Sequence, residues 1–182
     1  MIILESRPWF DWRSRIVGQN IVTVDYLSAD GNTYTVSVDL SDANIPEGAY
    51  LQVEELSADE AEEYIKEAAI AVDTKVKDLL YSKALDISII YNNEKIQPDG
   101  NVRVEVTLQD KKKDIITEVV HFGDETEVLD SETDGKTVDF TTDGFSVFAI
   151  VGTETITTNY ITAEGDTYEV TVTYGRDAEI PD

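Results

Sequence analysis

The chain has 182 residues, of which 41% are hydrophobic and 29% are charged, as is usual for a folded protein. Its formal net charge of -24 disfavours nucleic acid and anionic membrane surfaces as partners. The absence of cysteine excludes a thiol nucleophile and a thiolate metal site, and no apolar run is long enough for a transmembrane helix. We therefore expect a chain with no nucleic-acid partner, no membrane insertion, no metal and no cofactor.

The N-terminal segment holds both tryptophans of the chain and a cluster of arginines. The stretch SRPWFDWRSR predicts a short helix over residues 6–17, with Trp9, Trp12 and Ile16 on one face. Trp and Arg are the residues that contribute most to protein-protein interfaces, so we predict that residues 1–19 form a helical binding segment. Its predicted contact residues are Arg7, Trp9, Phe10, Trp12, Arg13, Arg15 and Ile16.

The same tryptophans permit a second interpretation. Large aromatic side chains are usually buried, so Trp9 and Trp12 could instead anchor the N-terminus to the core. The two interpretations are compatible if one tryptophan points inward and the other outward.

The first regular elements after this segment are predicted to be strands at residues 20–28, 33–40 and 49–55. The first two alternate polar and apolar residues, and the turn ADGN between them contains a glycine suited to a tight hairpin. The sequence therefore predicts a β-hairpin that is followed by a further strand.

One helix is predicted over residues 58–72, because Ser57 and Glu60 form a capping-box pattern in front of it. We expect Tyr64, Ala68 and residues 70–72 to form its buried side. A further helical turn is expected to include Val76, Leu79 and Leu80.

From Leu85 onward the pattern predicts short strands at regular intervals, separated by turns such as GDE, TDG and DG. The predicted fold class is α+β and mainly β. It consists of a hairpin, one helix that covers a face or an edge of a sheet, and an antiparallel, sandwich-like β part. Beyond the N-terminal segment, we divide the chain into a hairpin and helix part, an antiparallel β part and a C-terminal hairpin, at residues 20–82, 83–152 and 153–182.

The C-terminal hairpin repeats the first one. Residues 24–48 recur at residues 158–182, where Tyr160 matches Tyr26, TYEVTV matches TYTVSV, and both copies continue to Ile-Pro. The two copies lie about 134 residues apart, which is the size of a domain and much longer than a solenoid repeat. The second copy therefore either opens a further module or closes this one, an organisation found in tandem surface proteins.

Five short pieces of the chain carry a resemblance to a known repeat: IPEG at 45–48, EEY at 62–64, ALDISI at 84–89, VVHFG at 119–123 and GFSVFAIV at 144–151. With these pieces, residues 40–152 resemble a repeat of large, cell-wall-anchored proteins of Gram-positive gut bacteria. The resemblance implies an extracellular, wall-attached location within a larger protein, and it brings no catalytic residues.

The terminal β part also resembles the ZU5 and UPA families, some members of which cleave themselves at His-Phe-Ser. Here the corresponding residues are His121, Phe122 and Gly123, so the hydroxyl nucleophile of that motif is missing and self-cleavage is not implied. The acidic, cysteine-free and repeated chain with its Trp- and Arg-rich segment is also similar in style to immunoglobulin-binding B-cell superantigens.

Residues that could carry chemistry form no recognised motif. His121, the only histidine, lies in a predicted strand, where a structural role is the usual one. Pairs such as Glu125 and Glu127 are typical of a solvated acidic loop in a chain with 38 acidic residues. Calcium binding stays an alternative, although the spacing is not that of an EF-hand loop, and its candidate ligands are Asp124, Glu125, Asp130 and Asp134.

Two lysine-containing features complete the sequence analysis. Surface domains of the collagen-adhesin B type carry isopeptide bonds in an apolar pocket, and Lys83 is the best candidate for one here, although the sequence identifies no partner. The stretch QDKKKD at residues 109–114 is predicted to be a solvated turn between strands, with binding as the alternative.

Together these observations predict a non-catalytic bacterial surface module that binds a host protein. In its most specific form, this hypothesis takes the host protein to be an immunoglobulin. The chain would then bind the framework of the variable region, as a superantigen binds a Fab. One alternative is a structural spacer of an adhesin, with both tryptophans buried. The other is a carbohydrate-binding module, with exposed tryptophans stacked on sugar rings.

Overall fold

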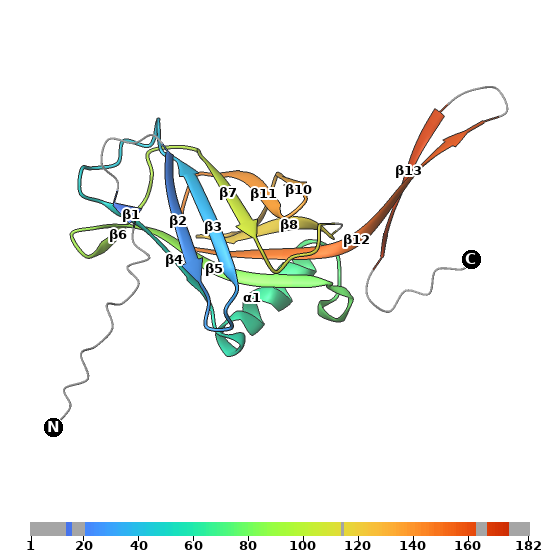
Figure 1. Ribbon diagram of the computed structural model, residues 1–182, viewed down its shortest axis with the longest axis horizontal. Coiled ribbons are helices and arrows are strands. Elements are labelled where there is room, and N and C mark those ends of the chain that lie inside the picture. The colour runs from blue at the N-terminus through green and yellow to red at the C-terminus, as the bar shows by residue number, and fades with distance from the viewer. Residues whose placement is uncertain (1–13, 16–20, 114, 163–166, 175–182) are drawn as a thin grey trace.

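The computed structural model describes residues 14–15, 21–113, 115–162 and 167–174. These residues form two antiparallel β-sheets that pack face to face, with a helix on the outer face of the larger sheet (Figure 1). The predicted fold class, mainly β with a sandwich-like part and a covering helix, is therefore confirmed.

The smaller sheet has five strands in the order β10-β11-β7-β3-β2. In β3, Tyr34, Val36 and Val38 are fully buried, whereas the threonine and serine residues between them point away from the core. This alternation is the one that predicted the first hairpin. The strands are β2 (Ile21–Leu27), β3 (Thr33–Asp39), β7 (Val102–Leu108), β10 (Ser131–Asp134) and β11 (Thr137–Thr142).

The larger sheet has eight strands, six of them in the order β1-β4-β5-β12-β8-β9, while β6 pairs with β5 and β13 with β12. Its central strands are buried on both faces, because the smaller sheet covers one face and the helix covers the other. The strands are β1 (Ser14–Arg15), β4 (Tyr50–Glu55), β5 (Tyr81–Tyr91), β6 (Glu94–Ile96), β8 (Ile115–Phe122), β9 (Thr126–Leu129), β12 (Val147–Ile161) and β13 (Thr167–Tyr174).

The predicted helix is present as α1 (Ala58–Ala71), and the predicted capping box of Ser57 and Glu60 is formed. Its buried residues are Ile65, Ala68 and Ala69, which pack on Val120 and Ala149 of the larger sheet. The further helical turn is a 3-10 turn at Val76–Asp78, so it includes Val76 as expected but ends before Leu79 and Leu80.

The prediction for the buried side of α1 was wrong at Ile70, whose side chain is 76% exposed, and at Ala71, which is exposed as well. Ile65 and Ile70 are five positions apart, which is about 140° around a helix, so they cannot share one face. The sheet selects the face of Ile65 because small residues of β5 and β12, Ala84 and Ala149, leave room for the helix there.

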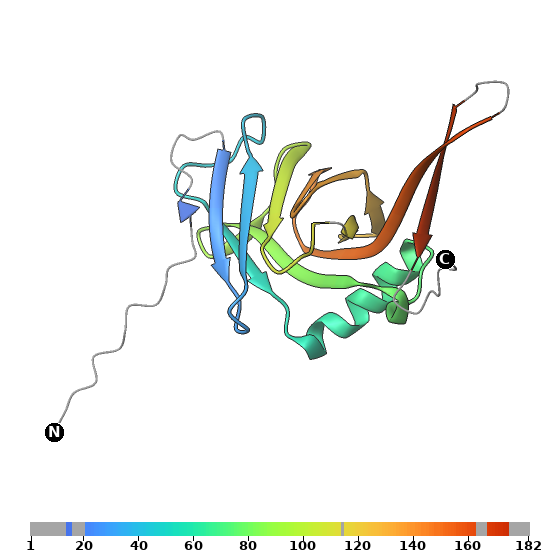
Figure 2. The ribbon, with the colours of Figure 1, turned by 45° about the vertical axis from the view of Figure 1, so that its right-hand side comes forward.

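The two predicted parts that meet between residues 82 and 83 share one core. The boundary falls inside β5, which begins at Tyr81, and the hairpin β2-β3 pairs directly with β7. The hairpin and the later β part therefore form a single sandwich, with α1 packed on its outside (Figure 2).

The strand β12 continues beyond the sandwich. Residues 147–152 pair with β5 and residues 147–154 with β8, and residues 154–161 then pair with β13 in a hairpin that projects from the sandwich (Figures 1 and 2). In this hairpin Tyr160 pairs with Tyr168, just as Tyr26 pairs with Tyr34 in the first hairpin. The repeat seen in the sequence is thus a repeat of structure, with the same register in both copies.

Candidate functional site

The predicted binding segment lies almost entirely outside the described residues. This applies to Arg7, Trp9, Phe10, Trp12, Arg13 and Ile16, so the structure does not test their exposure. Ser14 and Arg15 are described, and they form strand β1, which pairs with Leu51 and Tyr50 of β4. The predicted helix over residues 6–17 was therefore wrong at these two positions. The free edge of β4 offers unpaired backbone groups, and pairing with them competes with a helix too short to be stable alone.

A chain of hydrogen bonds runs through His121 at one end of the sandwich. His121 is 4% exposed, and its Nδ1 lies 3.0 Å from a carboxylate oxygen of Glu127. Its Nε2 lies 2.9 Å from Oγ of Ser146, and that hydroxyl is also 2.7 Å from the carbonyl oxygen of Phe122. The imidazole stacks on Phe148 with 4.6 Å between ring centroids.

This arrangement brings together a hydroxyl, an imidazole and a carboxylate, beside a cleft of about 750 Å³. Ser146 has one hydroxyl hydrogen, which it can donate either to His121 or to the carbonyl oxygen of Phe122. When Ser146 donates to the carbonyl oxygen of Phe122, its oxygen can accept a hydrogen bond from an N–H at Nε2 of His121. No local sequence pattern indicates this contact, because Ser146 lies 25 positions after His121.

A second cluster surrounds Lys83, near the start of β5. Its Nζ lies 2.5 Å from Oε1 of Glu55 and 3.8 Å from Oδ2 of Asp110. The carboxylate of Asp110 also accepts hydrogen bonds from Tyr81 at 2.9 Å and from Tyr34 at 3.4 Å. The structure thus supplies the acidic partners of Lys83 that the sequence did not identify.

Burial and charge set the protonation of this cluster. Burial, with the charges of Glu55 and Asp110 adding to it, raises the pKa of Tyr34 to about 12. Burial also raises the pKa of Tyr81 well above its ordinary value, so both phenols stay protonated donors at neutral pH. For Lys83, burial favours the neutral amine, but the hydrogen bonds to Glu55 and Tyr34 outweigh it and raise its pKa.

The prediction of a solvated turn for the basic stretch at residues 109–114 was wrong at Lys111. Lys111 is only 1% exposed, and its Nζ donates to the carbonyl oxygen of Gly135 at 2.6 Å. It therefore ties this turn to the turn between β10 and β11. Lys112 and Lys113 are exposed, as expected.

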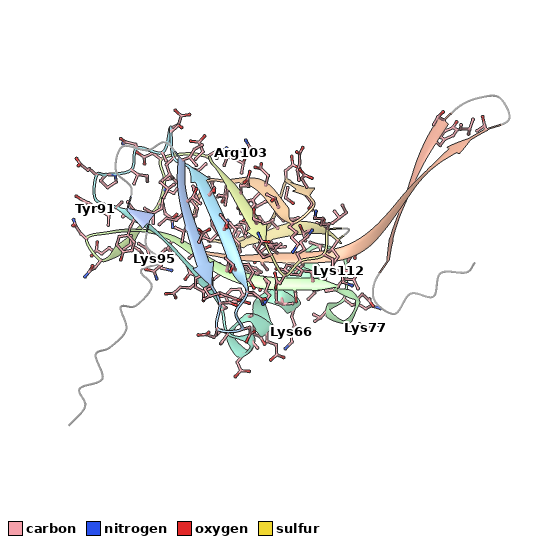
Figure 3. The ribbon with its side chains drawn as sticks, in the orientation of Figure 1. Lys66, Lys77, Tyr91, Lys95, Arg103 and Lys112 are labelled. Carbon is pink, nitrogen blue, oxygen red and sulfur yellow. The ribbon has the colours of Figure 1, made fainter. Side chains whose placement is uncertain are left out.

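Metal-ligating side chains do not gather on the described part of the chain. His, Asp and Glu form no cluster of three or more there that could hold a metal ion, so Asp124, Glu125, Asp130 and Asp134 do not converge within it. Three exposed cations lie on separate elements, Lys66 on α1, Lys95 on β6 and Arg103 on β7 (Figure 3). No helix among the described residues has the length and apolar character needed to cross a membrane.

The chain was also compared with known proteins. Comparisons with protein-family models, with curated sequences and with solved structures found no match. The likeness to wall-anchored repeats therefore stays an inference from the sequence motifs, and the function is argued from the geometry of the chain itself.

Proposed function

We propose that this chain is a non-catalytic module of a repetitive bacterial surface protein, and that it serves there as a structural spacer between neighbouring modules. One observation carries the proposal: the hairpin β12-β13 has a sequence similar to that of β2-β3 and the same register, but β13 has no partner strand equivalent to β7 among the described residues. In this view β12 is both the last strand of one sandwich and the first strand of the next.

The difference in burial between equivalent residues supports this interpretation. Tyr34 of the first hairpin is 0% exposed, because β7 lies beside it and pairs Leu108 with it. Its counterpart Tyr168 is 56% exposed. Burying a tyrosine of this size is favourable by about 2 kcal/mol, so the second hairpin lacks a contact that its sequence is suited to make.

The test is a two-module chain in which residues 48–152 are repeated after residue 182, where the sequence match between the hairpins would continue. We expect backbone amides of β13 to exchange slowly with deuterium in this chain and rapidly in the single module. The matched control carries Val104→Asp and Val106→Asp in the added copy, because charges at these two buried positions prevent its β7 from packing.

Rapid exchange of β13 in a two-module chain whose added copy is folded would rule the proposal out. Folding of the added copy is measured independently by the helical signal of its own α1 in circular dichroism. Protection of β13 in the control as well would show that it comes from a contact other than the second sandwich.

Binding of a host protein through residues 1–19 is the second candidate function. The observation that favours it is the pairing of β1 with β4, which attaches the end of this segment to an edge of the sandwich. The test compares binding of immunoglobulin Fab by the intact chain, a folded Trp9→Ala/Trp12→Ala variant and a Tyr168→Ala variant. Loss of binding in the double variant alone supports this function, and no binding by the intact chain removes it.

A further inference from the structure

The cluster around Lys83 places an amine between two carboxylates, at a point where the two sheets meet. Lys83 and Tyr81 belong to β5 of the larger sheet, and Glu55 ends the neighbouring strand β4. Tyr34 belongs to the smaller sheet, and Asp110 follows the end of β7 in that sheet. The side chains are largely withdrawn from water, with exposed fractions of 19% for Lys83, 13% for Glu55 and 19% for Asp110.

We propose that Lys83 and Asp110 become joined by an amide bond that the folded protein forms on itself. The bond would link the two sheets covalently through side chains. This inference does not depend on the proposed spacer function, because it concerns a reaction within one sandwich.

The two carboxylates of the cluster have different surroundings, and these assign their roles. Glu55 makes its contact with the ammonium of Lys83 at 2.5 Å, so it is placed to take a proton from it. Asp110 instead receives hydrogen bonds on both carboxylate oxygens, from Tyr81 on Oδ1 and from Tyr34 on Oδ2. Such donors withdraw electrons from the carboxyl carbon and stabilise the charge that develops on its oxygens during attack by the amine.

The reaction is a condensation that needs no oxidant and no further reactant. Glu55 accepts a proton from the Lys83 ammonium, and the resulting amine attacks Cγ of Asp110. A C–N bond forms, one C–O bond of the carboxylate breaks, and the departing oxygen leaves as water with the two protons that the ammonium gives up. The ring of Tyr34, whose centroid lies 5.8 Å from Nζ, helps to exclude solvent from the reacting groups.

The decisive measurement is the intact mass of the full chain under denaturing conditions. We expect the chain to be lighter than its sequence by the mass of one water molecule. A protease digest is expected to contain one branched peptide, in which the segment around Lys83 is attached to the segment around Asp110. Because the covalent bond survives unfolding, it can be detected in the denatured chain, and the variants are compared only once circular dichroism shows that they fold.

Four variants make the assignment specific. Lys83→Arg and Asp110→Ala are expected to have their full sequence mass, and Glu55→Gln is expected to lose water more slowly than the unmodified sequence. Lys95→Arg is the matched control: its ion pair with Asp86 spans 2.8 Å, but Lys95 is 55% exposed, and this variant is expected to keep the mass loss.

Three results would overturn the proposal. The first is a full sequence mass for the folded wild-type chain after prolonged incubation. The second is a water loss that persists in Lys83→Arg, which would indicate cyclisation of an aspartate elsewhere in the chain. The third is a branched peptide that joins Lys83 to Glu55, which would contradict the roles assigned to the two acids.

Discussion

Replacing Phe148 with alanine tests the packing between the two sheets most directly. Phe148 is 0% exposed and lies on β12, where its ring contacts the rings of His121, Phe140 and Phe145 at centroid distances of 4.6, 5.4 and 6.5 Å. Truncation of a fully buried phenylalanine to alanine costs about 3–5 kcal/mol, since it removes apolar burial and leaves a cavity between rigid strands.

The free energy of unfolding is measured by urea titration with circular dichroism. For an m-value of about 2 kcal/mol/M, the expected loss lowers the urea midpoint by about 2 M. Ile70→Ala on the exposed face of α1 is the control, and it is expected to change the stability by no more than about 0.5 kcal/mol. A decrease in the free energy of unfolding of less than about 1 kcal/mol for Phe148→Ala would refute the reasoning, because removal of a ring enclosed by three others is expected to destabilise the fold by more than that.

Three further predictions concern β12 and α1. Gly152→Val is expected to destabilise the fold by about 1–3 kcal/mol in the same titration, because even a Cβ atom there would lie 2.5 Å from Cγ2 of Ile115. Unchanged stability of this variant would contradict the prediction and would mean that β8 moves freely away from β12. Ser57→Ala is expected to cost about 1 kcal/mol through loss of the helix cap, and an equal stability of both proteins would contradict the observed capping box. The hydrogen bonds from the side chain and backbone of Ser57 lower the pKa of Glu60 in the folded protein. Their contribution to the free energy of unfolding is therefore present above the pKa that Glu60 has in the unfolded chain, and it is lost as pH falls through the pKa of Glu60 in the folded protein. Glu60→Gln should therefore flatten the acid limb of a stability-versus-pH curve, and an unaltered limb would argue against this origin.

The elements that the sequence predicted well are those with a local cause. The capping box fixed the start of α1, and the alternation of residues fixed the strands of the first hairpin.

The contacts that the sequence did not predict join distant segments. Asp110 reaches Tyr81 across 29 positions, and Ser146 reaches His121 across 25, so no local pattern could have indicated either contact. The strand at Ser14 and Arg15 was missed for a related reason, since the free edge of β4 that pairs with it is a product of the completed sheet. Lys111 was assigned to solvent because lysines usually are, whereas the carbonyl oxygen of Gly135 gives its ammonium a buried partner.

The continuity of β12 has a mechanical consequence for any array built in this way. Glu154 pairs with Ile115 of the sandwich on one side and with Tyr174 of the hairpin on the other, so no linker residues separate the two units. A strand of 15 residues spans about 50 Å, and its backbone is held in hydrogen bonds along the way. Tension applied to one unit would pass to the next through a hydrogen-bonded strand instead of first extending a slack connector. The bend and twist of this one strand would then set the angle between successive units, and with it the straightness and reach of the whole fibre.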